Sequence, residues 1–214
     1  AVLMVWREEA CSTSELIFRI IWQMGGFEKM STQCAIPIYC GMMTDTGGFT
    51  YHSSDPEIYF IISELLTKGI DKDKIYKNVY HNYSQWAIRL RGYIMSQKLN
   101  VLDDLHASYF AISRENMRDF AFVKGDAEGL VNIPLSIRGM KLAISLREDD
   151  RKDNVVWVSL RSVGDFPCNE MASKFFNGGG HVNASGGKLL CSLDEAVKIT
   201  REAIAYYSVQ LKKK

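Results

Sequence analysis

The sequence has no excess charge of either sign and no long hydrophobic run. Its 214 residues include 26 Lys and Arg and 25 Asp and Glu, a formal net charge of +1. That balance excludes a strongly basic coat for nucleic acid but is compatible with a local basic pocket. The longest apolar stretches, such as residues 35–43, are much shorter than the ~20 residues of a membrane-spanning helix. No basic-then-apolar leader opens the chain, so we expect neither secretion nor membrane association.

Cysteines at metal-binding or redox spacing are missing as well. The five cysteines are Cys11, Cys34, Cys40, Cys168 and Cys191. Their number is odd and no C-x-x-C pair occurs, so we expect reduced, structural thiols and a cytoplasmic protein. With 47% hydrophobic and 24% charged residues the chain can bury a core, which excludes a wholly disordered chain.

Helix signals dominate the first hundred residues. Ser12 and Glu15 predict a capping box, and apolar residues then recur at helical spacing up to Gly25. Asp55-Pro56-Glu57 predicts the start of another helix, with Ile58, Ile61, Ile62, Leu65 and Leu66 as its buried face and Gly69 after its end. Two further helical segments are predicted over 72–80 and 85–97.

Residues 34–43 fit two structures. Their Ile-Pro-Ile-Tyr content favours a buried strand, while their length also suits a helix that begins near Pro37. In either form, the segment leads into the polar turn Thr44-Asp45-Thr46-Gly47-Gly48.

The pattern becomes β-rich after residue 97. Strands are predicted over 107–112, 141–146 and 155–160, a loop over 125–129, and a solvated hairpin tip over 149–153. Helices are predicted over 167–176 and after the capping box of Ser192 and Glu195. This order predicts an α/β protein with two lobes, joined near residues 84–98.

The glycine-rich segment 177–187 is the sharpest candidate for chemistry. It holds five glycines in eleven residues, together with His181 and Ser185. Glycine loses more backbone entropy on folding than other residues, so such a segment suits close approach of the backbone to a ligand. Exposed amides beside a hydroxyl and an imidazole suit a phosphate. The alternative is a glycine-rich hairpin with a surface histidine.

Two single residues also suit phosphate or metal chemistry. Arg161, flanked by Ser159 and Ser162, ends an apolar strand and could bind a phosphate; the alternative is an ordinary charge at a strand end. Asp45 follows an apolar segment and lies in a turn that contains glycine, so its carboxylate suits a metal ion. The alternative is that this carboxylate makes a hydrogen bond within its own turn. The other histidines, His52, His81 and His106, have no ligand-spaced partners and are interpreted as structural or solvated.

These motifs together resemble the DHH and DHH-associated-domain phosphoesterases. Residues 178–186, Gly-Gly-Gly-His-Val-Asn-Ala-Ser-Gly, resemble the GGGHxxASG signature of the associated domain. The Thr44-Asp45-Thr46-Gly47 segment resembles the fourth metal motif of the family, and residues 12–15 resemble the start of the helix before it. Residues 159–162 and 128–131 fit the associated domain too. The resemblance is closest to the bacterial branch that degrades very short RNAs and dephosphorylates 3′-phosphoadenosine 5′-phosphate.

The resemblance implies a domain organisation and a site. Residues 1–83 would be the carboxyl-terminal part of a parallel-sheet DHH domain, 84–98 a helical linker, and 99–214 a mixed-sheet associated domain that binds substrate. In such enzymes two manganese ions activate the attacking water. Asp45 would be a metal ligand. The substrate-binding residues would be Arg161, Ser162, Gly178, Gly179, Gly180, His181 and Ser185. A homodimer is compatible with this family, and no catalytic acid is assigned.

One departure from the family pattern is large. The Asp-x-Asp motif, the second-motif Asp and the Asp-His-His triplet, which in the family precede the segment at Cys11, do not occur here. The chain also opens on apolar residues, 1–6, without an initiator Met. We therefore expect the chain to be the carboxyl-terminal part of a longer enzyme and to be inactive by itself.

Two other functions share part of this pattern. Domains with the GGGH signature also assist RNA binding in alanyl-tRNA synthetases, so a non-catalytic binding module is one alternative, which Asp45 and its preceding helix disfavour. Polyphosphate hydrolysis is the other. Base-stacking aromatic side chains would distinguish nucleotides from polyphosphate, and Tyr51 is a candidate.

Overall fold

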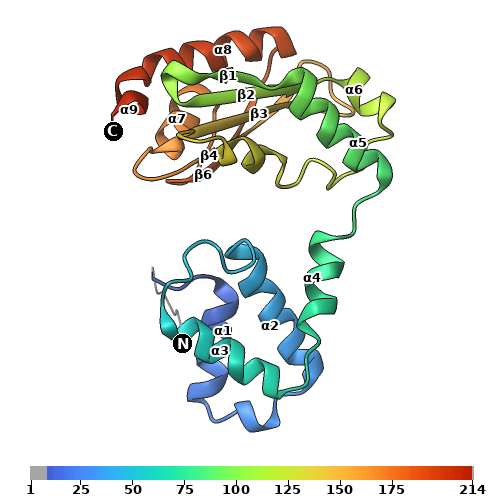
Figure 1. The fold of residues 1–214 in the computed structure, drawn as a ribbon, viewed down its shortest axis with the longest axis vertical. Coiled ribbons are helices and arrows are strands. Elements are labelled where there is room, and N and C mark those ends of the chain that lie inside the picture. The colour runs from blue at the N-terminus through green and yellow to red at the C-terminus, as the bar shows by residue number, and fades with distance from the viewer. Residues whose placement is uncertain (1–8, 214) are drawn as a thin grey trace. The chain divides into compact units, whose positions relative to one another are not determined.

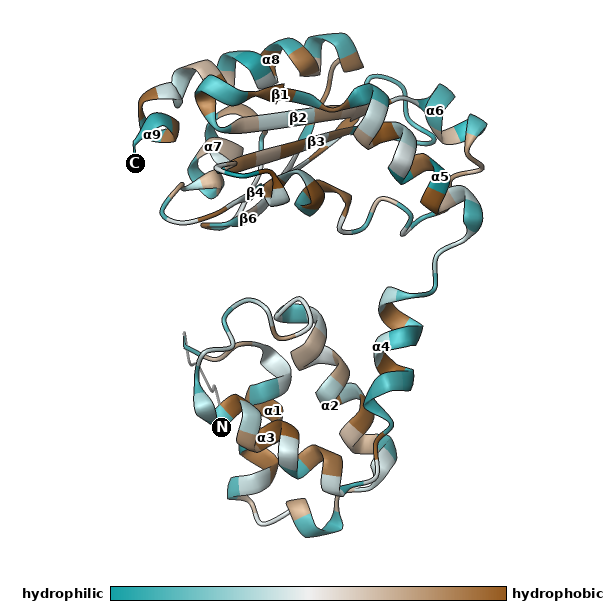
Figure 2. Cartoon of the chain, viewed as in Figure 1, coloured by the Kyte–Doolittle hydropathy of each residue, from teal (hydrophilic) through white to brown (hydrophobic). Residues whose placement is uncertain are grey.

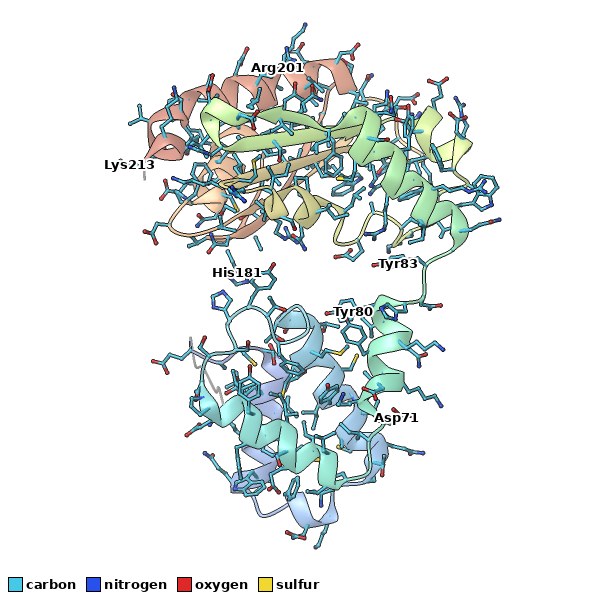
Figure 3. The ribbon with its side chains drawn as sticks, viewed as in Figure 1. Asp71, Tyr80, Tyr83, His181, Arg201 and Lys213 are labelled. Atoms are coloured by element: carbon cyan, nitrogen blue, oxygen red, sulfur yellow. The ribbon has the colours of Figure 1, made fainter. Side chains whose placement is uncertain are left out.

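The computed structural model describes residues 9–213, which form two compact units that divide between Asn82 and Tyr83 (Figure 1). Tyr80 ends the last helix of the first unit, and Tyr83 precedes the first helix of the second (Figure 3). The apolar residues 1–6 lie outside the described part of the chain. No helix within residues 9–213 is both long and apolar enough to cross a membrane.

The first unit is built from helices over its described residues. These are α1 (Thr13–Gln23), a 3-10 turn (Phe27–Lys29), α2 (Thr32–Asp45), α3 (Pro56–Thr67) and α4 (Lys72–Tyr80). The predicted helix starts at Pro56 and Lys72 are confirmed. Ile58, Ile61 and Leu65 are buried as predicted, whereas Leu66 is 39% exposed. No strand forms within residues 9–82, so the parallel sheet implied for this lobe stays a prediction.

The strand interpretation of residues 34–43 is wrong, because the segment lies inside α2. The helix also begins five residues before Pro37 rather than near it. Ser31 is the N-cap residue, and its hydroxyl accepts a hydrogen bond from the Cys34 amide at 3.3 Å. Pro37 therefore sits within the helix, where its missing N–H removes one backbone bond. Tertiary packing outweighs the β propensity here, since Ala35, Ile38 and Tyr39 enter the core.

The cap of α1 also joins it to α3. The Ser12 hydroxyl accepts a hydrogen bond from the Glu15 amide at 3.1 Å, as predicted, but the Glu15 carboxylate accepts from the Cys11 amide at 2.7 Å. The buried Glu15 carboxylate also pairs with Arg19 at 2.7 Å, and Arg19 reaches Glu57 of α3 at 2.5 Å. Burial, with a smaller contribution from Glu15, raises the pKa of the Cys11 thiol to about 11. The raised pKa keeps this thiol protonated at neutral pH, whereas the thiolate is the nucleophilic form.

The second unit contains a mixed sheet and its helices. In chain order its main elements are α5 (Gln85–Tyr93) with a π turn (Ile94–Lys98), β1 (Asn100–Leu102), β2 (Ala107–Ile112), α6 (Arg114–Asp119), a 3-10 segment (Leu130–Ser136), β3 (Leu142–Glu148), β4 (Val156–Ser162), α7 (Cys168–Phe175), β5 (Gly179–His181), β6 (Ala184–Leu189), α8 (Leu193–Tyr206) and α9 (Ser208–Lys212). The predicted strands are confirmed, with β3 and β4 each beginning one residue later and ending two residues later than expected.

Within residues 9–213 the sheet has six strands in the order β1-β2-β3-β4-β6-β5. Only β2 and β3 are parallel, and the other neighbouring strands are antiparallel. The α/β class with a mixed sheet in the second lobe is therefore confirmed. Most of β3 is hydrophobic in Figure 2, whereas α8 alternates between hydrophobic and hydrophilic residues. This pattern is typical of a central strand covered by an amphipathic helix.

Each face of the sheet has its own apolar cluster. On one face, residues of β3 and β4, among them Leu142, Ile144 and Leu160, pack against α7 and α8. On the other face, Phe110 and Ile112 of β2 pack against Leu90 and Ile94 and against Leu130. The helical segment 85–98 therefore packs within the second unit. That second cluster covers β2, and the 3-10 segment also packs against β3 and β4, so exposed positions on this face remain on parts of β4 and β6.

Candidate functional site

The exposed part of the sheet presents cationic side chains on β3, β4 and β6. Side chains alternate along a strand, and Val156, Val158 and Leu160 of β4 are buried, so the residues between them point to the other side. The outward residues of β4 and β6, with the neighbouring Arg147 of β3, are Arg147, Trp157, Ser159, Arg161, Ala184, Gly186 and Lys188. These seven residues are called the open face. Three of them are cationic and none is acidic.

Arg161 and His181 belong to one cross-strand row of this surface. Arg161 of β4 is paired with Ala184 of β6, and Ala184 is paired with His181 of β5. Directly paired residues of antiparallel strands have Cβ atoms ~5 Å apart on the same side of the sheet. Because only the small Ala184 stands between them, the two basic side chains can approach one bound anion. Arg161 is half-buried and donates to its own neighbour's carbonyl, Leu160 O, at 2.9 Å.

The predicted glycine segment is a hairpin of β5 and β6 in which the backbones come very close. A Cβ on Gly178 would lie 1.9 Å from Gly186 O, and a Cβ on Gly187 would lie 2.2 Å from Phe176 O. Gly180 has φ +142°, and its Cβ would lie 2.7 Å from Ala184 O. Gly179 has nothing within 4 Å of that position. Three glycines are thus required by the hairpin itself, and Gly179 leaves its backbone open to a ligand.

The two predicted serines hold the hairpin in place. The buried Ser162 hydroxyl donates to Phe166 O at 2.7 Å and accepts from Asn183 Nδ2 at 2.9 Å. The buried Ser185 hydroxyl donates to His181 O at 2.8 Å and so fixes the backbone of that histidine. Ser162 therefore holds the backbone next to Arg161, and Ser185 holds the backbone of His181. The hydroxyl on the open face belongs to Ser159, which sequence reasoning treated only as a neighbour of Arg161.

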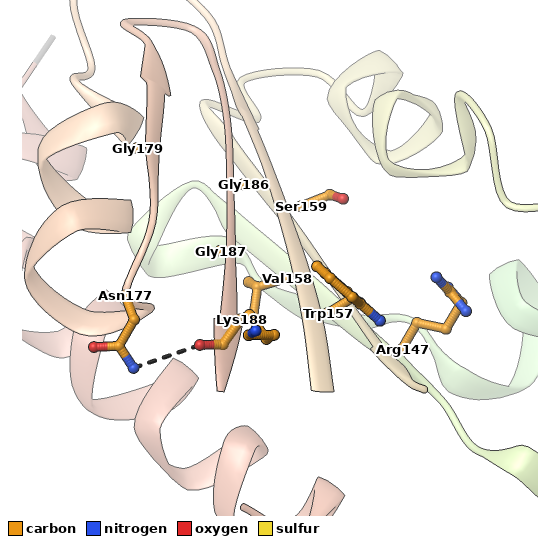
Figure 4. A pocket seen from close by; sticks show the side chains of 9 residues that line it. All are labelled: Arg147, Trp157, Val158, Ser159, Asn177, Gly179, Gly186, Gly187 and Lys188. Carbon is orange, nitrogen blue, oxygen red and sulfur yellow. Dashed lines mark hydrogen bonds between the residues drawn. The ribbon is translucent and has the colours of Figure 1, made fainter. Parts of the chain in front are cut away.

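A pocket on the same surface lies further along the strands. It has a volume of about 570 Å³ and is open to solvent, and its lining includes Arg147, Trp157, Ser159, Gly179, Gly186 and Lys188. Figure 4 shows the Trp157 indole between Lys188 and Arg147. The amide of Asn177 donates to Lys188 O at 3.4 Å at the edge of this pocket. Sequence reasoning missed the side chains of Arg147, Trp157 and Lys188, although the alternation in β4 places Trp157 on the same side of the strand as Arg161.

Asp45 is the last residue of α2 in the first unit, and its side chain is exposed. The turn after it is held by the buried Thr46, whose hydroxyl donates to Met42 O at 2.7 Å and accepts from the Phe49 amide at 2.9 Å. Gly47 and Gly48 have φ +57° and +74°, which explains why glycines follow. The predicted polar turn is therefore present.

The described residues do not by themselves form a metal centre. Within residues 9–213 no group of three or more His, Cys, Asp or Glu side chains is placed to hold a metal ion. One exposed carboxylate is not enough, because a divalent cation needs several protein ligands. No chemical step is therefore derived through a metal on these residues.

The sequence comparison with protein families agrees with the hairpin and its sheet. Residues 108–205 match the DHHA1 domain, a region that begins within β2 and ends near the end of α8. All seven predicted substrate-binding positions and the whole open face lie inside this match.

Comparison with solved structures and curated proteins extends the similarity to the rest of the chain. A crystal structure of an exopolyphosphatase-related protein from Bacteroides fragilis is similar with 51% identity and a TM-score of 0.93, covering 98% of this chain and 60% of that one. The proteins called bifunctional oligoribonuclease and PAP phosphatase NrnA are 29% identical in Bacillus subtilis and 26% identical in Thermus thermophilus. These matches cover 89% and 90% of this chain.

The chain spans somewhat more than half the length of these relatives, 58% of the Bacillus protein and 56% of the Thermus protein. Their similarity runs through both units, and the DHHA1 match contains the glycine hairpin with Arg161 and His181. The chain therefore contains a DHHA1 domain and is similar through both units to proteins that are named as oligoribonucleases and PAP phosphatases.

Proposed function

We propose that the open face binds the phosphates of a nucleotide or a short RNA. We further propose that the whole protein hydrolyses phosphoesters of short oligoribonucleotides and of nucleoside 3′,5′-bisphosphates. The observation that carries this proposal is the row in which Arg161 and His181 flank Ala184 beside the open backbone of Gly179. The names of the NrnA relatives support the substrate class.

The chemistry of this row suits a phosphate. Arg161 provides a planar, permanently charged donor that can bind two phosphate oxygens at once. His181 is exposed at the end of β5 and can donate a hydrogen bond to the same group, stabilising negative charge that develops on the phosphoryl oxygens. The Ser185 bond to His181 O keeps that residue in register. These residues bind and orient the substrate, and none is assigned as general acid.

Manganese is proposed for the whole enzyme on the family resemblance alone. Asp45 would supply one carboxylate ligand, and the other ligands would have to come from beyond the described residues. When bound, the metal would activate the attacking water and polarise the phosphoryl group. A cytoplasmic location and a homodimer likewise stay predictions.

Binding to the 214-residue chain tests this function. Isothermal titration with 3′-phosphoadenosine 5′-phosphate, with the oligoribonucleotide A5 and with tripolyphosphate should show binding of the two nucleotides. Arg161→Ala should weaken both by about 1.5–3 kcal/mol, the scale of a charge-assisted hydrogen bond. Arg151→Ala removes the same charge from the exposed hairpin tip and serves as the matched control.

Three other results of these titrations would contradict the proposal in whole or in part. Equal affinities of Arg161→Ala and the unsubstituted chain for both nucleotides would remove Arg161 from the site. Binding of tripolyphosphate in preference to nucleotides would favour polyphosphate hydrolysis instead. The absence of any nucleotide binding would overturn the proposed function.

A further inference from the structure

Trp157 lies on the open face, and a cationic side chain stands on each neighbouring strand. Its side chain is 43% exposed on the outward side of β4. Its register partners are Arg147 on β3 and Lys188 on β6, so a cation stands on each neighbouring strand. Gly179, Gly186 and Gly187 are among the residues that line the pocket beside it, and they place no side chains in that space.

The indole is held in a fixed orientation. Its Nε1 donates a hydrogen bond to Asp149 Oδ2 at 2.8 Å, at the hairpin between β3 and β4. The Lys188 ammonium lies 5.7 Å from the ring centroid, near the ~6 Å limit of a cation–π contact, so a planar ligand displaces it at little cost. Arg147 is oriented in part by the ring of Phe122, at 5.5 Å.

An aromatic ring beside cations is the arrangement that binds single-stranded nucleic acid. Base–aromatic stacking contributes about 1–3 kcal/mol per base and depends little on sequence, and the flanking cations take the phosphates. A free phosphate or polyphosphate has no aromatic ring that could stack on the indole. The combination therefore fits a nucleotide unit rather than an anion alone.

The pocket at Trp157 and the proposed phosphate-binding row of Arg161 and His181 lie at different positions along the same strands. Trp157 and Arg161 lie on the same side of β4 and four residues apart, roughly 13 Å along the strand. A nucleoside bisphosphate bound at Arg161 has no second base to place on Trp157, whereas an oligoribonucleotide has one.

We propose that Arg147, Trp157 and Lys188 form a second nucleotide subsite, in which the indole stacks on a base and the two cations bind the adjoining phosphate. This inference rests on the proposed function of the Arg161–His181 row. The subsite selects oligoribonucleotides over nucleoside bisphosphates, because only the former extend from one position to the other.

The test compares two ligands on the full 214-residue chain. Trp157→Ala should weaken A5 binding roughly tenfold or more, the scale of one lost stacking contact. It should change the affinity for 3′-phosphoadenosine 5′-phosphate by less than about twofold, and Trp157→Phe should keep most of the A5 affinity. Arg147→Gln and Lys188→Gln should each make A5 binding less dependent on salt.

Trp86 provides a matched control in the same unit. It is 39% exposed on α5 and lies beside Arg89, whose guanidinium is 5.1 Å from its ring, but this pair stands on a helix and is not part of the open face. Trp86→Ala should leave A5 binding unchanged. An equal loss in Trp86→Ala and Trp157→Ala would overturn the subsite.

Fluorescence gives a reading that does not depend on the alanine variant folding. A5 should quench the emission of the unsubstituted chain, and Trp157→Phe should lose that quench while still binding A5. If Arg161→Ala weakens both ligands but Trp157→Ala and Trp157→Phe leave A5 binding and quenching unchanged, the subsite is refuted and the proposed function stands. If the unsubstituted chain binds neither ligand, both are refuted.

Discussion

The Trp157 indole and the Asp149 carboxylate are joined by a hydrogen bond of 2.8 Å from Nε1 to Oδ2. The other carboxylate oxygen accepts hydrogen bonds from the Arg151 and Lys152 amides at 3.0 and 2.9 Å. The bond from Trp157, followed by the two amide bonds, lowers the pKa of Asp149 to about 2. One exposed carboxylate thereby fixes both the hairpin tip and the indole of the open face.

Asp149 should make the second unit sensitive to acid. Because its pKa is lowered on folding from the usual 3.8, the unfolded chain binds the proton more readily. The contribution of this carboxylate to stability is therefore complete above about pH 5 and is lost as the pH falls toward 2. Asp149→Asn should be less stable than the unsubstituted chain at pH 7, and the difference should shrink at pH 3. Urea unfolding at the two pH values measures this.

Asp150 supplies the control for that experiment. It is the next residue of the hairpin tip, and its carboxylate lies 3.7 Å from Arg151 rather than on the indole. Asp150→Asn should give the same loss of stability between pH 7 and pH 3 as the unsubstituted chain. A constant stability difference for Asp149→Asn across this range would contradict the assignment.

The glycines of the hairpin should differ sharply in their tolerance of a methyl group. Gly178→Ala would place Cβ 1.9 Å from Gly186 O, so the two backbone segments must separate. Overpacking of this kind costs roughly 1–3 kcal/mol. Gly179→Ala meets nothing within 4 Å and should leave the stability nearly unchanged. Thermal unfolding of the two variants tests the assignment, and equal melting temperatures would show that the hairpin is looser than described.

The turn after Asp45 should depend on one buried hydroxyl. Thr46→Val removes a donor to Met42 O and leaves the Phe49 amide without its 2.9 Å acceptor, a loss of about 1–3 kcal/mol. Thr44→Val is the matched control, because the Thr44 hydroxyl lies on an exposed residue and donates to Gly41 O at 3.1 Å. Urea unfolding should show the larger loss in Thr46→Val, and the reverse order would place the support of the turn elsewhere.

Local signals predicted most of the helices and strands. Caps and breakers act within a few residues, so Ser12, Asp55-Pro56 and Ser192 fix helix starts without reference to the rest of the chain. The segment 34–43 is different. Its β-branched and proline content is a local preference, and the packing of Ile38 and Tyr39 into a helical core overrides it.

The open face could be predicted only in part for the same reason. The glycine motif and Arg161 are visible in one stretch of sequence each, but their meeting depends on β4 lying beside β6, a register that no local pattern specifies. Trp157, Arg147 and Lys188 come together through that register as well. Close backbone approach at Gly178 and Gly187 likewise shows only in three dimensions.

We expect Arg91 to stabilise the start of the second unit, where Tyr83 precedes α5. Its guanidinium carbon lies 4.2 Å from the centroid of the Tyr83 ring, and its Nη2 donates to Glu128 O in the loop before the 3-10 segment. A double-mutant cycle of Arg91→Ala and Tyr83→Ala should give a coupling of about 0.5–2 kcal/mol, the range of a partly desolvated cation–π contact. The pair Arg89 and Trp86 on the same helix is more exposed and 5.1 Å apart, so its cycle should give a smaller value. A coupling at Arg91–Tyr83 no larger than at Arg89–Trp86 would mean that the bond to Glu128, not the ring contact, carries the role of Arg91.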